Sequence, residues 1–361
     1  MPPFALPVGP LTACALRDVA KAVKHSSDAA AVAVQQGFVG RLVAILTPAA
    51  PAVDSKIRLW VLRTLWCLSL HVDAPHVSAA QPQILDCVLA ALTGGTQDEE
   101  AYACLDAVRA CIETTSGVVY FVVAGGIELL SKVLAHALCP PLVALRVLDC
   151  LAGLQHSGNC VSHLHLVIRA VYAAMITHRG SALVQTSAVQ LLAAFARDNT
   201  VALLATHTAM DVVTVVRAAM DAHRSSKSLQ QYGCVVLGRL PGLLHVAVVA
   251  NLVIRATSLA PRSCGFVCDG CTALYTTMKS APSARKLMQL VCENFVRGLL
   301  ALHPTCSAVQ AKGNKVLAYL SDGPVFAPVD LGSDTDAASD WDSEVDPGAC
   351  VPAPLKRVCR K

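Results

Sequence analysis

Apolar residues recur along most of this chain at the spacing of an amphipathic α-helix. Between residues 212 and 240 they form two stripes at intervals of three, four and seven residues, and the polar run 221–228 separates the stripes. The stripes comprise Val212, Val213, Val216 and Met220, and then Leu229, Gly233, Val236, Leu237 and Leu240. This stretch therefore predicts a helical hairpin with an apolar face that it cannot bury alone.

The hairpin is one copy of a repeat. Three copies align without internal gaps, each with a histidine at the end of the first helix and a glutamine seven residues later: His178 and Gln185, His223 and Gln230, His303 and Gln310. Gln230 follows Gln185 by 45 residues and Gln310 follows by a further 80, so a weaker copy is expected between them, at Gly270-Cys271. Gly233 and Gly313 occupy equivalent positions, where we expect two helices to approach closely.

Weaker copies extend the pattern upstream and give about seven units, which begin near residues 35, 77, 116, 158, 199, 243 and 281. Stacking such units would bury their apolar faces in one continuous core. We therefore predict an all-α solenoid in three parts. These are an N-terminal cap at 1–34 with a capping helix at 11–34, repeats at 35–323, and a disordered tail at 324–361 with an acidic stretch and a basic end.

Two motifs resemble those of armadillo repeats. Ala124-Gly-Gly-Ile127 is similar to the opening of that family's second helix, and Leu65-Trp-Cys-Leu-Ser-Leu70 is similar to its third-helix segment. The form Ala-Met-x-x-His followed by Leu-Gln-x-x-Gly-Cys resembles repeats of leucine-rich-repeat kinases and related armadillo-only proteins. The resemblance covers about residues 35–320 and implies a right-handed armadillo/HEAT-like superhelix. Its role is open, because armadillo proteins serve adhesion, transport, signalling and cilium assembly.

The resemblance also implies where a partner would bind, because the third helices of armadillo repeats line a concave groove. The matching positions nominate as groove residues Trp66, Gln190, Arg239, Lys315 and Tyr319. Importin-α-like members hold cargo with a ladder of asparagines, and the equivalent positions here are Leu70, Gly153, Ala194, Arg239, Thr276 and Tyr319. None is asparagine, so a nucleocytoplasmic transport adaptor is a disfavoured alternative.

Composition bears on three questions: whether the chain spans a membrane, in which compartment it folds and whether it binds nucleic acid. The chain has 361 residues, 54% of them hydrophobic, yet the longest uncharged apolar run, Leu240–Ile254, is too short to span a membrane and contains Pro241, His245 and Asn251. Sixteen cysteines scattered along the chain favour a reducing compartment, the cytoplasm or alternatively the nucleus. The basic residues are spread over many helices without interleaved aromatics, which argues against a nucleic-acid surface.

Candidate chemistry is sparse. Cys264, Cys268 and Cys271 have zinc-like spacing but lack a second cysteine pair, so we interpret them as core thiols and keep a metal-dependent regulator as an alternative. The repeated histidines are one per unit, and we interpret them as helix-end residues that meet exposed carbonyls. The chain has no P-loop, dinucleotide-binding or nucleophile-elbow motif. We expect no enzymatic activity, cofactor or small-molecule substrate.

The C-terminal tail, residues 324–361, contains one further candidate binding motif. Residues 330–346 contain seven acidic residues, and Trp341 is their one aromatic residue. Ser339 and Ser343 adjoin acids, as substrates of acidophilic kinases do, so Ser339, Trp341 and Ser343 form a candidate binding motif. A plug for a mildly basic groove and a solubilising tail are the alternatives. The whole sequence favours a non-catalytic scaffold or adaptor that binds a segment of a protein partner.

Overall fold

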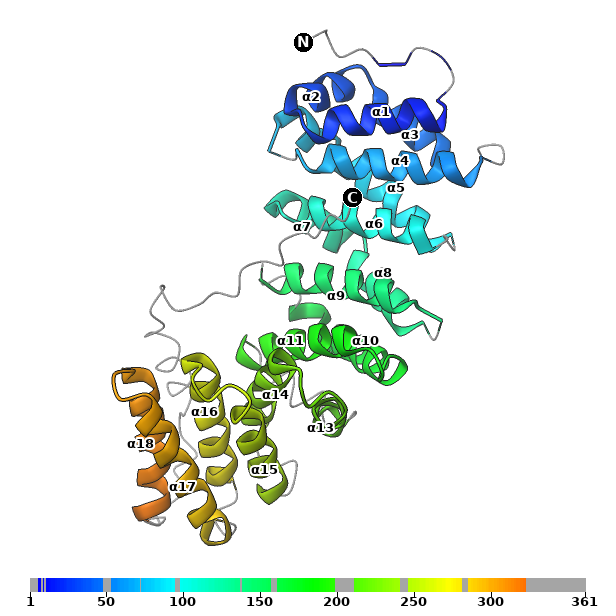
Figure 1. Ribbon diagram of the computed structural model, residues 1–361. Helices are drawn as coiled ribbons and strands as arrows, with labels where there is room; N and C mark the ends of the chain where they lie inside the picture. The colour runs from blue at the N-terminus through cyan, green and yellow to red at the C-terminus, as the bar shows by residue number, and fades with distance from the viewer. Residues whose placement is uncertain are drawn as a thin grey trace.

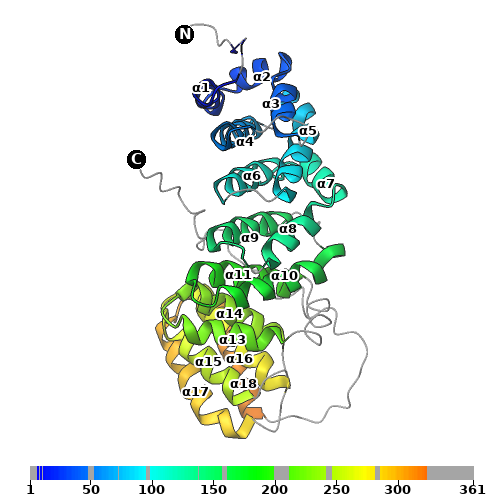
Figure 2. The same ribbon diagram turned by 90° about the vertical axis from the view of Figure 1, so that its right-hand side faces the viewer.

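The computed structural model describes residues 6–7, 9, 11–47, 53–71, 73–94, 98–136, 138–156, 161–198, 211–240, 246–280 and 285–322. Over these ranges the chain forms seventeen α-helices and one 3-10 helix, and no strand. The predicted all-α class is confirmed. The helices stack in two rows (Figure 1, Figure 2), and α1 and α18 lie at opposite ends.

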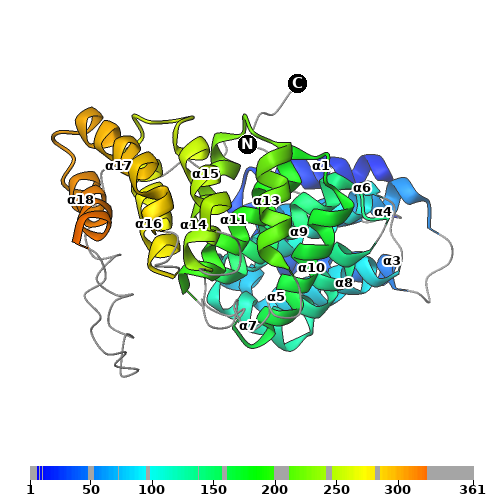
Figure 3. The ribbon, with the colours of Figure 1, turned by 90° about the horizontal axis from the view of Figure 1, so that it is seen from below.

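In the first row, which we call the ladder row, each helix packs against the next one. This row comprises α1 (Ala13–Lys24), α4 (Ser55–Ser69), α6 (Asp98–Cys111), α9 (Pro141–His156), α11 (Ala182–Asp198), α14 (Lys227–Arg239), α16 (Cys264–Ser280) and α18 (Ser307–Asp322). Its N-terminal helices lie roughly parallel in Figure 1, whereas α16 and α18 run steeply across that direction, so the stack twists along its length. Seen from below, α16 and α18 lie to one side of the N-terminal helices (Figure 3).

The second row covers one side of the ladder row. It comprises α2 (Ser27–Gln35), α3 (Phe38–Leu46), α5 (Pro75–Thr93), α7 (Thr115–Val123), α8 (Gly126–Ala135), η1 (Val161–His163), α10 (Leu164–Thr177), α13 (Val212–Ala222), α15 (Val246–Thr257) and α17 (Arg285–Leu302). Seven helices of this row, α3, α5, α8, α10, α13, α15 and α17, each pack against the ladder helix that follows in sequence. The helical hairpin expected from the apolar stripes is therefore the recurring unit.

The N-terminal region differs from the single capping helix that we expected at 11–34. Two helices, α1 and α2, occupy it, because Ser26 starts a new helix two residues after Lys24. The Ser26 hydroxyl accepts a hydrogen bond from the Ala29 N–H at 3.1 Å, as Thr12 does from Ala15 at 3.2 Å. These N-caps satisfy backbone donors that would otherwise lack partners.

Two glycines turn the chain sharply within the second row. Gly37 and Gly125 have φ values of 70° and 74°, in the left-handed region that glycine adopts without a steric penalty. The helices on either side bend by 73° between α2 and α3 and by 71° between α7 and α8. The Gly-Gly-Ile motif at 125–127 thus begins α8, with Gly126 against the ring of Phe121.

Small residues let the rows approach each other, as expected for Gly233 and Gly313. A Cβ at Gly233 would strike Met220, and one at Gly313 would meet Leu300. Cysteines fill the core in the same way: Cys67, Cys104, Cys150 and Cys234 are buried, as the sequence predicted. Burial raises the pKa of the Cys150 thiol to about 12.

Among the described residues, no individual helix combines the length and the apolar character needed to cross a bilayer. The two pairs that meet at the bends described above, α2 with α3 and α7 with α8, satisfy that test only when each pair is counted together.

Candidate functional site

All five nominated groove residues lie on the ladder row. Trp66 is on α4, Gln190 on α11, Arg239 on α14, and Lys315 and Tyr319 on α18. Gln190 and Lys315 are exposed, and the other three side chains are partly buried. Lys315 and Tyr319 share α18, whereas α4, the helix that carries Trp66, lies near the opposite end of the stack (Figure 1).

Lys315 and Tyr319 belong to a compact group on α16 and α18, which we call the aromatic–lysine cluster: Tyr275, Lys279, Lys315 and Tyr319. The Lys315 Nζ lies 4.9 Å from the centre of the Tyr275 ring, a cation–π contact. The rings of Tyr275 and Tyr319 meet edge to face at 5.7 Å, and the Tyr319 hydroxyl donates to the Met278 carbonyl at 3.2 Å. Burial and the positive charge of Lys279 lower the pKa of Lys315.

A second group lies beside this cluster around Asp269 of α16. The Gln231 side chain on α14 donates to the Asp269 carboxylate at 2.9 Å. Burial raises the pKa of Asp269, while Gln231 and the positive charges of Arg197, Lys312 and Arg239 oppose that rise. Charges from α11, α14 and α18 therefore converge on a single carboxylate. We call Arg197, Arg239, Lys279, Lys312 and Lys315 the cationic face.

Sequence reasoning missed Asp269, Arg197, Lys312 and Tyr275. A signal for one of them was present, because Lys312 precedes Lys315 by three residues and shares its side of α18. The convergence on Asp269 had no sequence signal, since it requires the relative placement of four helices.

The N-terminal part of the ladder row arranges its charges differently. Arg58 on α4 lies 3.5 Å from Glu100 on α6, and Arg146 on α9 lies 3.5 Å from Asp106 on α6. These distances join guanidinium nitrogens to carboxylate oxygens of the neighbouring helix. Trp66 contacts Lys24, whose Nζ lies 5.4 Å from the ring centre. Here opposite charges from adjacent helices pair.

The repeated histidines and glutamines are structural. The side-chain amide of Gln230 donates to the carbonyls of Met220 at 2.7 Å and His223 at 3.3 Å, where α13 ends. Gln185 and Gln310 form the same pair of bonds in their own units. Each glutamine therefore ties its ladder helix to the exposed carbonyls at the end of the preceding second-row helix.

The histidines link adjacent units, a detail that the helix-end interpretation did not include. The Nε2 of His223 lies 2.9 Å from the Arg179 carbonyl, and that of His303 lies 2.7 Å from the Pro261 carbonyl. Both carbonyls belong to the preceding unit. His178 departs from this pattern, because its buried Nε2 meets no hydrogen-bond partner within the described chain, and burial lowers its pKa.

The three candidate metal-binding cysteines lie at or near the start of α16. Cys268 and Cys271 are buried, and burial raises their pKa values to about 11 and about 12. The Cys264 sulfur lies 3.5 Å from Nδ1 of His303. Across the ranges that the structure describes, no three histidine, cysteine or acidic side chains are placed to share a metal ion. Buried thiols with raised pKa values are poor thiolate ligands.

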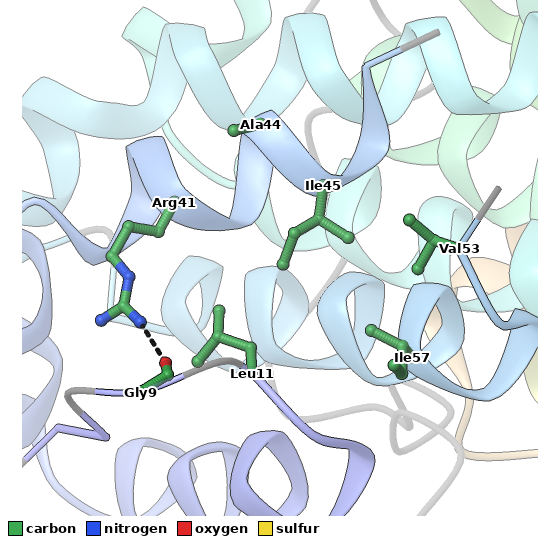
Figure 4. Close-up of a pocket in the computed structure, with 7 residues that line it drawn as sticks. All are labelled: Gly9, Leu11, Arg41, Ala44, Ile45, Val53 and Ile57. Atoms are coloured by element: carbon green, nitrogen blue, oxygen red, sulfur yellow. Dashed lines mark hydrogen bonds between the residues drawn. The ribbon is translucent and has the colours of Figure 1, made fainter. Parts of the chain in front are cut away.

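An open hollow lies near the N-terminus, and none of the nominated residues lines it (Figure 4). Its lining is mainly apolar and comprises Gly9, Leu11, Arg41, Ala44, Ile45, Val53 and Ile57. The Arg41 guanidinium donates to the Gly9 carbonyl at 3.0 Å and to the Pro7 carbonyl at 2.9 Å. The Arg41 side chain therefore binds two backbone carbonyls that precede α1 in the sequence. The tail motif of Ser339, Trp341 and Ser343 lies outside the described residues.

Comparison with known proteins adds little to this geometry. No family model and no curated protein matches the chain. The crystal structure of an engineered protein, a structural-genomics target, resembles 86% of this chain and 95% of its own at 17% sequence identity, with a TM-score of 0.34.

Proposed function

We propose that this chain is a non-catalytic interaction scaffold built as an armadillo-type solenoid of about seven repeats. In this proposal the ladder row lines a concave groove, and a segment of a protein partner binds along it. The two-row stacking of hairpins supports the architecture, because stacked repeats bury their faces against neighbours and leave one row to bind partners. The described cysteines are largely buried, as Cys104 and Cys234 are, which suits a reducing compartment, the cytoplasm or the nucleus.

The observation that carries the proposal is the cationic face together with the aromatic–lysine cluster. Arginine and tyrosine are enriched at the centres of protein interfaces, where they contribute more binding energy than other residues. Arginine, tyrosine and lysine side chains lie here on the successive ladder helices α14, α16 and α18, and these side chains are exposed or partly exposed. A partner segment lying across α14, α16 and α18 would contact several of them at once.

The cationic face also argues against the alternatives. A transport adaptor for basic peptides would bring like charges together, which is unfavourable. A fluorescence-anisotropy titration with a basic signal peptide should therefore show no binding. Elemental analysis of the purified protein should likewise find no stoichiometric zinc, which a metal-dependent regulator using Cys264, Cys268 and Cys271 would require.

Charge reversal tests the proposed groove. Affinity purification with the full chain would identify partners, and the variant R239E/K315E should recover them at least about tenfold less well, which corresponds to about 1.4 kcal/mol of binding free energy. The matched control is K132E/R169E, which changes the charge equally at one exposed lysine and one exposed arginine on the second-row helices α8 and α10. Equal recovery by the two variants would contradict the proposal.

A further inference from the structure

We propose that the acidic segment 330–346 of this chain binds intramolecularly to the cationic face, across α14, α16 and α18. This inference rests on the proposed function, because it assigns a regulator to the same groove. The bound segment would occupy the cationic face until a partner displaced it with an acidic segment that binds the face more tightly.

Charge complementarity is the first argument. The positive charges of Arg197, Arg239 and Lys312 act on the single carboxylate of Asp269, and burial together with the positive charge of Lys279 lowers the pKa of Lys315. Positive charges grouped around one carboxylate outnumber it, and an anionic ligand reduces the repulsion among them. Residues 330–346 supply seven carboxylates within seventeen positions.

The reach of the chain is the second argument. The last described helix, α18, carries Lys312, Lys315 and Tyr319 and ends at Asp322, only eight residues before Asp330. Eight extended residues span roughly 25 Å, and neighbouring helices lie about 10 Å apart, so the segment reaches α16 and α14 without strain. A short tether also gives an effective concentration of about a millimolar, which favours binding in cis over a second copy.

The aromatic–lysine cluster is the third argument. Trp341 stands between Asp340 and Asp342, so a ring and two carboxylates arrive together. Tyr275 and Tyr319 already form an edge-to-face pair, and Lys315 lies over one of the rings. Such a surface favours a further aromatic ring flanked by negative charge, because ring pairs and cation–π contacts add to the attraction between charges.

The test uses the full chain with 5-fluorotryptophan at its three tryptophans, and W341F identifies the ¹⁹F signal of Trp341. We expect this signal to differ from that of a free peptide of residues 328–348 and to stay unchanged on tenfold dilution. The variant K279E/K312E/K315E should move it to the free-peptide position. The matched control K21E/K56E/K132E, at three exposed lysines on α1, α4 and α8, should leave it in place.

Carbodiimide crosslinking of the unmodified chain locates the contact, because this reagent joins carboxylates to lysine amines. We expect crosslinks from residues 330–346 to Lys279, Lys312 or Lys315, with a yield that falls at least about tenfold in R197E/R239E, which removes no lysine. Circular dichroism checks that each variant keeps its helices.

Three results would overturn the inference: a Trp341 signal equal to that of the free peptide, a signal that changes on dilution as binding to a second copy predicts, or crosslinks directed mainly to other lysines. Each leaves the proposed function open, because recovery of a partner by the groove variants is measured separately.

Discussion

The two ends of the ladder row differ in how their charges are arranged. From α4 to α9, charges of opposite sign pair across neighbouring helices, as Arg58 does with Glu100 and Arg146 with Asp106. From α11 to α18, positive side chains converge on the single carboxylate of Asp269. Cross-helix pairing stabilises a stack, whereas an excess of one sign suits a ligand of the other. Under the proposed function, the partner would therefore bind the C-terminal half of the row.

The hydrogen bonds between the rows differ as well. In the C-terminal units a ladder-row glutamine holds the end of a second-row helix, as Gln230 does. In the N-terminal half the direction is reversed, because Gln81 of α5 donates to the Cys111 carbonyl at the end of ladder helix α6, at 2.7 Å. The two halves therefore place their most sensitive polar contacts on opposite rows.

The largest expected effect breaks the N-terminal contact. A Cβ at Gly117 would collide with the Cys111 carbonyl and the Gln81 amide, so Gly117→Ala should cost about 3 kcal/mol of unfolding free energy through overpacking and loss of that hydrogen bond. Hydrogen exchange should show faster opening confined to α5, α6 and α7. Gly298→Ala, within α17, is the control: no described atom beyond its chain neighbours and the helix's own backbone lies within 4 Å of an added Cβ, so a gain of about 0.5–1 kcal/mol is expected.

Removing the glutamine of a C-terminal unit should have the next largest effect. Gln230→Ala removes the side-chain donor to the Met220 and His223 carbonyls at the end of α13, although His223 still accepts from the Ser226 N–H at 3.0 Å, and we expect a loss of about 2 kcal/mol. Chemical denaturation measures this loss, and exposed Gln190→Ala should change stability by less than about 0.5 kcal/mol. Similar losses from both substitutions would show that the repeated bonds are not stabilising.

Acid should weaken the unit that contains His178. Burial lowers the pKa of this imidazole in the folded state, so its contribution to stability is complete above the unfolded value of about 6.5 and is lost as the pH falls below it. Melting temperatures between pH 8 and pH 5 should fall less steeply in His178→Gln, which cannot gain a proton. The matched substitution His165→Gln, at an exposed position, should keep the wild-type slope; parallel profiles for all three proteins would refute this role.

The smallest effect concerns the paired charges. Arg146 is half-exposed and pairs with Asp106 and Asp149, so Arg146→Gln should cost less than about 1 kcal/mol. The loss should shrink in 0.5 M salt, because salt screens exposed ion pairs. A large loss that salt leaves unchanged would mean that the side chain acts through packing instead.

The sequence predicted the hairpin unit because the apolar stripes and the repeated His and Gln positions record contacts made within each unit. Second-row helices begin at residues 38, 75, 115, 161, 246 and 285, close to six of the predicted unit starts, and the start near 199 lies outside the described residues. Contacts between units were harder to predict. The link from His223 to Arg179 and the convergence on Asp269 depend on how the stack twists, and periodicity does not encode that twist.

The buried cysteines give the molecule a set of internal reporters. Cys67, Cys104, Cys150, Cys234 and Cys292 lie at intervals along the stack, all shielded from solvent. A thiol reagent can modify each one only after its own surroundings open, so labelling rates read by mass spectrometry would rank the repeats by how readily they unfold. These native thiols would therefore show whether the ends or the middle of the stack unfold first, with no labelling site added to the sequence.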